Sequence, residues 1–420
     1  MQAFRKIPEW VTLEHQVAQI LTEQEQHGWR FDEPAARELE SSLRKEYEET
    51  SKLLRNRYPY VSGPVFTPKR NNRTKGFYAG APFTKLKDLN PTSRDHIAWI
   101  LTSHHGWTPS SMTASGKPVI DETVLKELGT DIALNFLKLL DLTKKLGMIS
   151  EGVNAWQKLV TKSSRIHHHC SVATQTFRVA HRSPNLGQVP SDPRFRKLFT
   201  VTSGLKMVGA DLAGVELRML SHYLARYDGG RYADILLNGD IHQTNADRVG
   251  VTRKQIKTIS YAFLYGAGDI KLGHSYDKQL STEKARKKGK EIRKAYVDAI
   301  PGLETLLAAV HKASERGYVL GLDNRRIIVD SRHKSVNYLI QGSSAILAKR
   351  WMVLAYENLP KTARQLAFVH DELQYECEEK DVDDLKFLLE LSAAQAGEYY
   401  KLRCPIAAEA QSGDTWADVH

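Results

Sequence analysis

The sequence predicts an α+β protein built from two or three lobes, and three observations support this. Residues 11–57 carry apolar side chains at helical spacing, with a single break near HGWRFDEP. Near the C-terminus, QLAFVHDELQYECEE alternates apolar and polar residues on both sides of a tight HDE step, which predicts a β-hairpin. A chain of 420 residues is also long for one hydrophobic core.

The remaining elements follow from local patterns along the chain. Residues 58–93 are rich in Pro, Gly, Asn and Lys, so we expect a long basic loop there. The apolar run LKMVGAD predicts a strand that leads directly into a helix, GVELRMLSHYLARY. Further helices are expected over Ser93–Thr102, Asp121–Val160, Arg253–Leu264 and the basic stretch TEKARKKGKEIRKAYVDAI, and an irregular stretch over residues 170–199.

The composition is that of a folded, basic protein. Sixty Lys and Arg residues against 49 Asp and Glu give a formal charge of +11, which fits either a polyanionic partner or a merely basic surface. We find no apolar run long enough to span a membrane and no signal-peptide core. The three cysteines show neither disulfide pairing arithmetic nor metal-ligand spacing, so we expect free thiols in a reducing compartment.

A histidine run and a pair of acidic strand ends both suggest metal binding, and we interpret only the acids in that way. In RIHHHC, three consecutive side chains cannot face one ion in a regular element, so we interpret this run as surface residues. Asp211 ends the predicted strand LKMVGAD, and Asp371 lies in the HDE step. Two strand-end carboxylates on apolar elements are satisfied jointly by divalent cations, which prefer carboxylate and phosphate oxygens.

The helix predicted over Arg253–Leu264 presents two cations and an aromatic ring on one face. Arg253, Lys257 and Tyr261 are spaced by four residues, which places them within an arc of about 80°. Such a face suits a polyphosphate with a sugar or base beside it. Gly266 and Gly268, just beyond the helix, permit close backbone approach.

Seven segments resemble motifs of the polymerase part of the A-family DNA polymerases, particularly the phage replicative branch. They follow one another along the chain in the order that the family has. DLAGVELR resembles the first palm motif DYSQIELR, RKQIKTISYAFLYG the fingers pattern RxxxKxxxFGxxYG, and VHDEL the last palm motif. The supporting segments are RSPNLGQVP, RFRKLF, NGDIH and NYLIQGSSAIL. The likeness runs from about Val11 to His420. It implies a right-hand polymerase with an antiparallel-sheet palm, helical fingers and a helical thumb.

The resemblance also implies how the chain is divided. Residues 1–165 would form the thumb, with N-terminal helices and the basic loop at about 58–93. Residues 166–240 would be the first part of the palm, residues 241–335 the fingers, and residues 336–420 the second part of the palm.

The resemblance implies roles at the chemical centre. Asp211 and Asp371, with the Leu212 carbonyl, would bind two Mg²⁺ ions, for which Mn²⁺ can substitute, and Glu372 would support them loosely at the rim. The deoxynucleoside triphosphate would be held by Arg253, Lys257 and His242, with Lys257 acting on the leaving pyrophosphate. The remaining implied nucleotide contacts are Tyr261 against the sugar, Tyr265 beside the templating base, and Glu216, which excludes a ribose 2′-hydroxyl through a hydrogen bond to Tyr265.

Contacts with primer–template DNA are implied in the same way. Arg178, Asn337 and Gln341 would sense the minor-groove edge of the new base pair, and His370 would touch the primer end. Gln188, in the PNL segment, and Gly266, after the fingers helix, complete the expected DNA-binding set. Phe177 and Asn324 stand where the family usually has Gly, although Asn tolerates a left-handed backbone.

The implied function is DNA-templated DNA synthesis from a primer 3′-hydroxyl, in phage genome replication within the bacterial host cytoplasm. About ten residues precede the first helix, so we expect no proofreading exonuclease in this chain, and a separate exonuclease or processivity subunit stays open. The segment 58–93 is shorter than the insertion with which some phage relatives capture thioredoxin, so thioredoxin is not expected.

Three other functions stay open from the sequence. A repair or translesion polymerase of the same family is the nearest alternative. A single-subunit RNA polymerase is disfavoured by Glu216 and Glu372, because its third motif typically has HDS. A non-catalytic DNA-binding subunit would not need Asp211, Asp371, Arg253 and Lys257.

Overall fold

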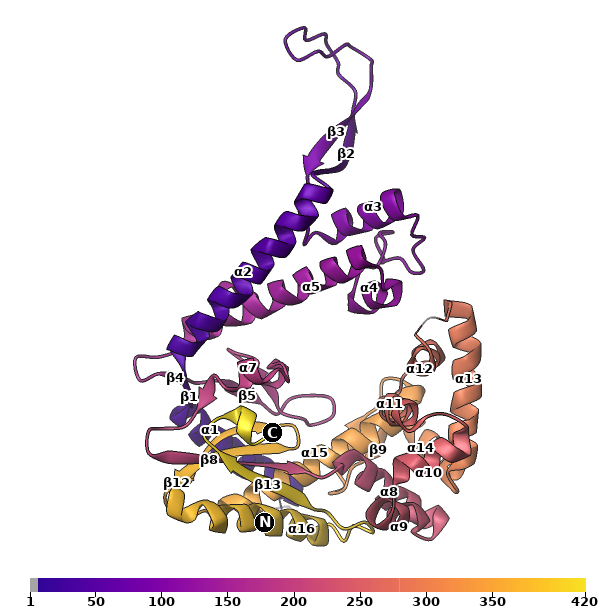
Figure 1. Ribbon diagram of the computed structural model, residues 1–420. Coiled ribbons are helices and arrows are strands. Elements are labelled where there is room, and N and C mark those ends of the chain that lie inside the picture. The colour runs from indigo at the N-terminus through magenta and orange to yellow at the C-terminus, as the bar shows by residue number, and fades with distance from the viewer. Residues whose placement is uncertain (1–6, 279) are drawn as a thin grey trace, which may run out of the picture. The chain divides into compact units, whose positions relative to one another are not determined.

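The computed structural model describes residues 7–278 and 280–420 (Figure 1). Residues 1–6, which belong to the expected thumb and to the N-terminal stretch tested for a signal peptide, lie outside the described residues, as does Gln279. The chain forms two compact units. One comprises Met1–Glu33 and Leu159–His420, and the other comprises Pro34–Lys158.

A four-stranded antiparallel sheet is the centre of the larger unit. Its strand order is β11 (Arg364–Val369), β12 (Glu372–Glu378), β8 (Leu205–Leu212) and β13 (Ala408–Gly413). The predicted hairpin is confirmed as β11–β12, and the predicted strand-to-helix passage as β8 followed by α8 (Val215–Asp228). Helix α16 (Val382–Tyr399) covers β8 and β13 on one face (Figure 1).

Helix α15 (Ser335–Tyr356) is buried along nearly its whole length. Most of its side chains are apolar or small, as is typical of a helix that other elements surround. It contacts α1 (Glu9–His27), α8, α14 (Leu303–Ser314) and α16. The sheet and the helices of this unit therefore share one hydrophobic core.

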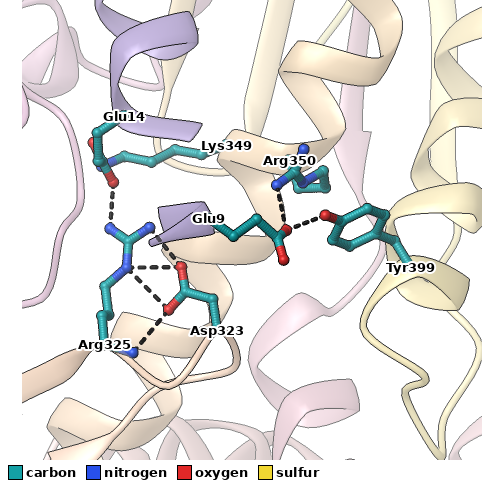
Figure 2. A network of polar contacts seen from close by, with 7 residues as sticks. All are labelled: Glu9, Glu14, Asp323, Arg325, Lys349, Arg350 and Tyr399. Atoms are coloured by element: carbon teal, nitrogen blue, oxygen red, sulfur yellow. Dashed lines mark hydrogen bonds and ion pairs between the residues drawn. The ribbon is translucent and has the colours of Figure 1, made fainter. Parts of the chain in front are cut away.

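Polar contacts fasten α1 to α15 (Figure 2). The Lys349 ammonium, only 1% exposed, donates to both carboxylate oxygens of Glu14, at 2.8 and 2.7 Å. Arg325 also bonds Glu14 and forms a forked contact with Asp323. The other members of this network are Glu9, Arg350 and Tyr399, where Arg350 and the Tyr399 hydroxyl both donate to Glu9.

Between β8 and β9 the chain of the larger unit forms consecutive helices. The predicted helix over Arg253–Leu264 is confirmed with the same bounds as α11, and Thr252 with Gln255 closes a capping box at its start. The basic helix is α13 (Thr282–Ala299), which packs on α12 (Asp269–Tyr276) so closely that a Cβ on Gly289 would lie 1.7 Å from the Asp269 carbonyl oxygen. The other helices here are α9 (Arg231–Asn238) and α10 (Ile241–Val249).

Short strands complete the larger unit. The stretch expected to be irregular contains a small ribbon, β5 (His169–Ser171) paired with β6 (Ala180–Arg182), and helix α7 (Pro193–Arg196). The other short pairs are β1 (Trp29–Phe31) between β4 (Arg165–Ile166) and β7 (Phe199–Thr200), and β9 (Tyr318–Leu320) with β10 (Arg326–Ile328).

The smaller unit is mainly helical, and it corrects one expectation. Residues 58–93 are not a plain loop, because β2 (Tyr60–Phe66) and β3 (Phe83–Asp88) pair there as an antiparallel hairpin. The rings of Phe66, Phe77 and Phe83 pack together, with Phe77 and Phe83 centroids 4.9 Å apart, and this apolar contact is what the Pro- and Gly-rich composition concealed. The helices of this unit are α2 (Glu33–Arg57), α3 (Arg94–His105), α4 (Glu122–Leu128), α5 (Asp131–Leu146) and α6 (Trp156–Leu159).

Candidate active site

Three acidic residues, Asp211, Asp371 and Glu372, meet where β8 ends and β12 begins. Glu372 is the first residue of β12 and lies directly opposite Asp211 on β8. The Leu212 N–H donates to the Asp371 carbonyl oxygen at 3.0 Å, which ties the HDE turn to the end of β8. Apolar neighbours drive both strands into the core, so the acids at their ends are carried to one place.

These carboxyl groups are kept from ionising freely. Burial and the neighbouring acids Asp371 and Glu372 raise the pKa of Asp211 to about 7. Burial also raises the pKa of Asp371, with Arg178 opposing it, and raises the pKa of Glu372 to about 7. Crowded carboxylates of this kind gain from a divalent cation, and hard oxygen donors are the ligands that Mg²⁺ prefers. The residues present therefore fit a divalent ion.

We expected Glu372 at the rim of the metal site. In the structure its side chain is buried and only 5% exposed. The Trp416 indole N–H and the Gln374 amide both donate to one of its oxygens, and His420 Nδ1 lies 3.1 Å from the other. Trp416 itself packs on Trp29, with ring centroids 4.8 Å apart. The carboxylate is turned toward the core because these donors lie there.

Arg196 supplies positive charge beside the acids. Burial lowers the pKa of its guanidinium, while Glu372 and Asp211 act to raise it. The guanidinium also lies over the Trp416 ring at 5.0 Å. Sequence reasoning missed Arg196, Trp416 and His420 as site residues. Their signals were the RFRKLF segment, noted only as a family feature, and the C-terminal DTWADVH.

Helix α11 presents the predicted cationic face. Arg253 and Lys257 are exposed, whereas the opposite face, with Ile256 and Ile259, is buried. Burial lowers the pKa of His242, and the charges of Arg253 and Lys257 lower it further, so the three groups lie together. Arg253 is engaged by Asp240 at 2.7 Å.

Tyr261 connects this face to the acids. Its ring centroid lies 6.4 Å from that of His242. Burial raises the pKa of its hydroxyl, and the carboxylates of Glu216, Asp371 and Asp211 raise it further. The cationic helix face and the acidic strand ends therefore border one space.

Glu216 lies beneath this space, 6% exposed. Burial and Glu216 raise the pKa of Tyr265 to about 12, so the Tyr265 hydroxyl lies near the Glu216 carboxylate. The Arg178 guanidinium also bonds the Glu216 carboxylate. That ion pair was not foreseen, and it occupies a side chain expected to face DNA.

The other expected DNA-binding residues lie around the HDE turn and the end of α11. His370 has a left-handed backbone, with φ of 61°, and a Cβ on Gly187, next to Gln188, would lie 3.7 Å from its Nε2. Asn337 uses its amide to donate to the Leu264 carbonyl at 2.8 Å. Gln341 follows it by one turn of α15, and Gly266 has φ of 69°.

Two of the positions at which a Gly of the family is replaced, Phe177 and Asn324, adopt left-handed backbone. Asn324 has φ of 63° and Phe177 has φ of 59°. Asn tolerates this conformation, whereas an aromatic residue there is strained. The strained Phe177 immediately precedes Arg178, and Arg325 lies over its ring at 5.0 Å.

No helix within residues 7–278 and 280–420 has the length and apolar character needed to cross a membrane. The fold is similar to that of the POL domain of Pol1 from M. smegmatis, solved in complex with DNA primer-template and dNTP. The TM-score is 0.78 at 22% identity, over 97% of this chain and 70% of that one.

Sequence comparison identifies relatives among phage enzymes. The DNA-directed DNA polymerases of Enterobacteria phage T3 and Escherichia phage T7 are each 29% identical to this protein, over 98% of this chain and 70% of theirs. Residues 74–418 match DNA polymerase family A. With acidic strand ends facing a cationic helix in a fold of this type, the chain belongs to DNA polymerase family A and is a DNA-directed DNA polymerase.

Proposed function

We propose that this polymerase extends a primer 3′-hydroxyl with deoxynucleoside triphosphates at Asp211 and Asp371, with two Mg²⁺ ions held between them. Polymerases of this family generally use divalent metal ions. The observation that carries the proposal is the buried acidic cluster, in which the pKa of Asp211 is raised to about 7. The Leu212 carbonyl completes the protein ligands, and Glu372 lies opposite Asp211 on the adjacent strand.

Bound there, the ions supply the positive charge that acidifies the attacking hydroxyl and neutralises the leaving pyrophosphate. Arg253, Lys257 and His242 bind the triphosphate. Burial and the charges of Arg253 and Lys257 lower the pKa of His242, which supports the proximity of the three groups. Lys257 lies on the same face of α11 as Arg253. It donates a proton to the pyrophosphate or neutralises its charge. Tyr261 packs against the sugar.

Selection of the nucleotide falls to residues beside the acids. Glu216, held by Arg178 and close to Tyr265, closes the space next to the sugar C2′ and excludes a 2′-hydroxyl. Arg178, Asn337, Gln341 and Gln188 contact the DNA minor groove or backbone. The minor-groove edge of a base pair presents acceptors common to all correct pairs, so contact with it tests the geometry of the pair and not its sequence.

The polymerase subdomains are proposed to follow the boundaries expected from the sequence. Residues 1–165 would contain the thumb, whose compact part is Pro34–Lys158, whereas α1 packs on α15 in the larger unit. Residues 166–240 and 336–420 would form the palm, and residues 241–335 the fingers. The compactness of Pro34–Lys158 supports a separate thumb, and the β11–β12–β8–β13 sheet supports the palm. The phage relatives support a role in phage genome replication.

The test is primer extension on a primed DNA template with Mg²⁺, using deoxynucleotides and ribonucleotides in parallel. We expect extension with deoxynucleotides alone, lost in Asp371→Ala. Asp383→Ala, which removes an acid from the first turn of α16, is the control. Extension by a folded Asp371→Ala protein would refute the assignment of the metal ligands.

A further inference from the structure

Three potential metal ligands, His168, Cys170 and His181, form a cluster on the β5–β6 ribbon. His168 and Cys170 are two residues apart, so they project to the same side of an extended chain. Cys170 and His181 are direct partners in the antiparallel register. One ligand atom from each residue lies within 4.8 Å of the other two. Sequence spacing did not indicate this grouping because its third member comes from the neighbouring strand.

The cluster is interior, which corrects the interpretation of RIHHHC as a surface run. His168 is fully buried and His181 is 6% exposed, while Cys170 is partly exposed. His181 Nδ1 lies 3.6 Å from Cys170 Sγ, and the two imidazole rings are stacked with centroids 5.4 Å apart. His167 and His169 bond instead to Glu25 of α1.

The two nitrogens of the buried His168 ring lie in different surroundings. Its Nε2 has a polar neighbour, the Gln24 side-chain amide. His168 Nδ1 is buried and has no hydrogen-bond partner within the described residues. Nε2, on the side of Gln24 and Cys170, is therefore the nitrogen that this ring offers to an ion.

The side-chain amide of Gln24 lies between His168 and Cys170 and donates toward both. Gln24 Nε2 lies 3.1 Å from His168 Nε2 and 3.4 Å from Cys170 Sγ. Its Oε1 accepts from Gln365 at 2.8 Å, and the Tyr375 hydroxyl donates to Gln365 at 2.8 Å. Since a hydroxyl can also accept, rotating both amides by half a turn preserves this chain of bonds and turns Gln24 Oε1 toward the cluster.

We propose that His168, Cys170 and His181 bind one thiophilic metal ion, Zn²⁺ or Cu⁺. Two imidazoles and a thiolate suit these ions and not Mg²⁺, which prefers oxygen. Zn²⁺ would take Gln24 Oε1 as the fourth ligand of a tetrahedron, whereas Cu⁺ is satisfied by the three side chains. On binding, the Cys170 S–H bond breaks, its electron pair forms the sulfur–metal bond, and the proton passes to solvent.

The ion would support the polymerase site without entering its chemistry. The strand β6 leads to the segment Leu186–Gln188, where a Cβ on Gly187 would lie 3.6 Å from His181 Cδ2 and 3.7 Å from His370 Nε2. Fixing His181 therefore fixes the backbone that borders the HDE turn. The ion would position His181 and the backbone beside the HDE turn. It can be detected without measuring polymerase activity.

The test uses the full chain, stripped of metal and titrated with Co²⁺ as a spectroscopic probe. A thiolate ligand produces a sulfur-to-cobalt charge-transfer band, which ions on the carboxylates of Asp211 and Asp371 cannot produce. We expect such a band at one ion per chain, its loss on adding Zn²⁺, and a higher melting temperature with Zn²⁺. A parallel anaerobic titration of Cu⁺ against a chromophoric chelator distinguishes the two ions by affinity.

Two variants remove single ligands. The nearly isosteric Cys170→Ser and the variant His181→Gln should each lose the band, and Zn²⁺ affinity should fall by more than the roughly 10- to 100-fold that loss of an outer-shell partner costs. His169→Gln, on the same strand but bonded to Glu25, and Cys404→Ser, a buried thiol elsewhere, should keep it. Circular dichroism checks that each variant is folded.

Two results would overturn the proposal. One is the absence of a thiolate band from the folded wild-type protein at saturating Co²⁺. The other is a band that persists in folded Cys170→Ser, or in folded His181→Gln where Cys170→Ser does not fold.

Discussion

Glu372 on β12 lies directly opposite Asp211 on β8, and both side chains have a pKa raised to about 7. Register pairing therefore sets two acids side by side in a buried place, with Asp371 in the adjoining turn. Such an arrangement opposes folding unless a cation is bound, and this sets what the site does and how it responds to substitution and pH.

Asp211→Asn should separate activity from stability. Polymerisation should fall by at least roughly a hundredfold, because a carboxylate ligand of the ions that stabilise the reacting phosphate is lost. The melting temperature in chelator should stay the same or rise, because a buried repulsive charge is removed. Glu409→Gln is the matched control, since Glu409 is the exposed partner of Asp211 on β13. Near-normal activity of Asp211→Asn would contradict the assignment.

The metal-free protein should lose stability as pH rises through the window set by these acids. The pKa of Asp211 rises from 3.8 to about 7 on folding, and that of Glu372 from 4.5 to about 7, so the folded state binds more protons across this window. Stability from these groups is present below the window and is lost through it.

Melting temperatures measured in chelator at successive pH values would check this. The difference between wild type and Asp211→Asn isolates the acidic cluster from other titrating groups. Glu376 does not interfere, since burial acts to raise its pKa but hydrogen bonds from His27, Thr202 and Arg165 lower it to about 2, which places its transition at lower pH. A difference that does not change with pH would count against raised pKa values.

Glu216→Ala should increase incorporation of ribonucleotides relative to deoxynucleotides, by roughly 10- to 200-fold in relative kcat/KM. The reason is that the carboxylate, held by Arg178 and close to Tyr265, no longer fills the space beside the sugar. Glu216→Gln, which keeps the volume, should stay closer to wild type. The measurement is single-nucleotide extension with each sugar, and unchanged discrimination in Glu216→Ala would rule out this role.

Lys257→Ala should lower kcat/KM for the nucleotide by roughly tenfold to a hundredfold, since a charge-assisted contact contributes about 1.5–3 kcal/mol. Lys254→Ala is the control, because this lysine is exposed on the same helix, lies off the face shared by Arg253 and Lys257, and carries the same charge. Steady-state extension kinetics would measure both. Equal losses in the two variants would point to a general effect of charge on DNA binding.

Glu14→Gln should destabilise the protein by about 3–5 kcal/mol, because it leaves the buried Lys349 ammonium without a carboxylate partner. Glu23→Gln removes an exposed carboxylate from the same helix, bonded to the Tyr356 hydroxyl, and should cost far less. Denaturant unfolding of both variants gives the comparison. Equal stability of the two would mean that Lys349 relaxes to solvent in the variant.

Local patterns in the sequence determined most of the elements and the family. Helix α11 has the predicted bounds, and β8, β11 and β12 lie where alternation and apolar runs placed them, because each pattern is read within one segment. The β2–β3 hairpin was missed because its stability comes from Phe66, Phe77 and Phe83, which are separated along the chain. Composition alone cannot show such a contact.

Tertiary structure decided which side chains meet. It buried Glu372 under Trp416, placed Arg196 beside the acids, and turned Arg178 onto Glu216. It also joined His168 and Cys170 with His181 across two strands. The sequence specifies the character of each segment through short-range periodicity, whereas strand register and core packing bring distant segments together, and burial then sets the charge state of the groups that meet.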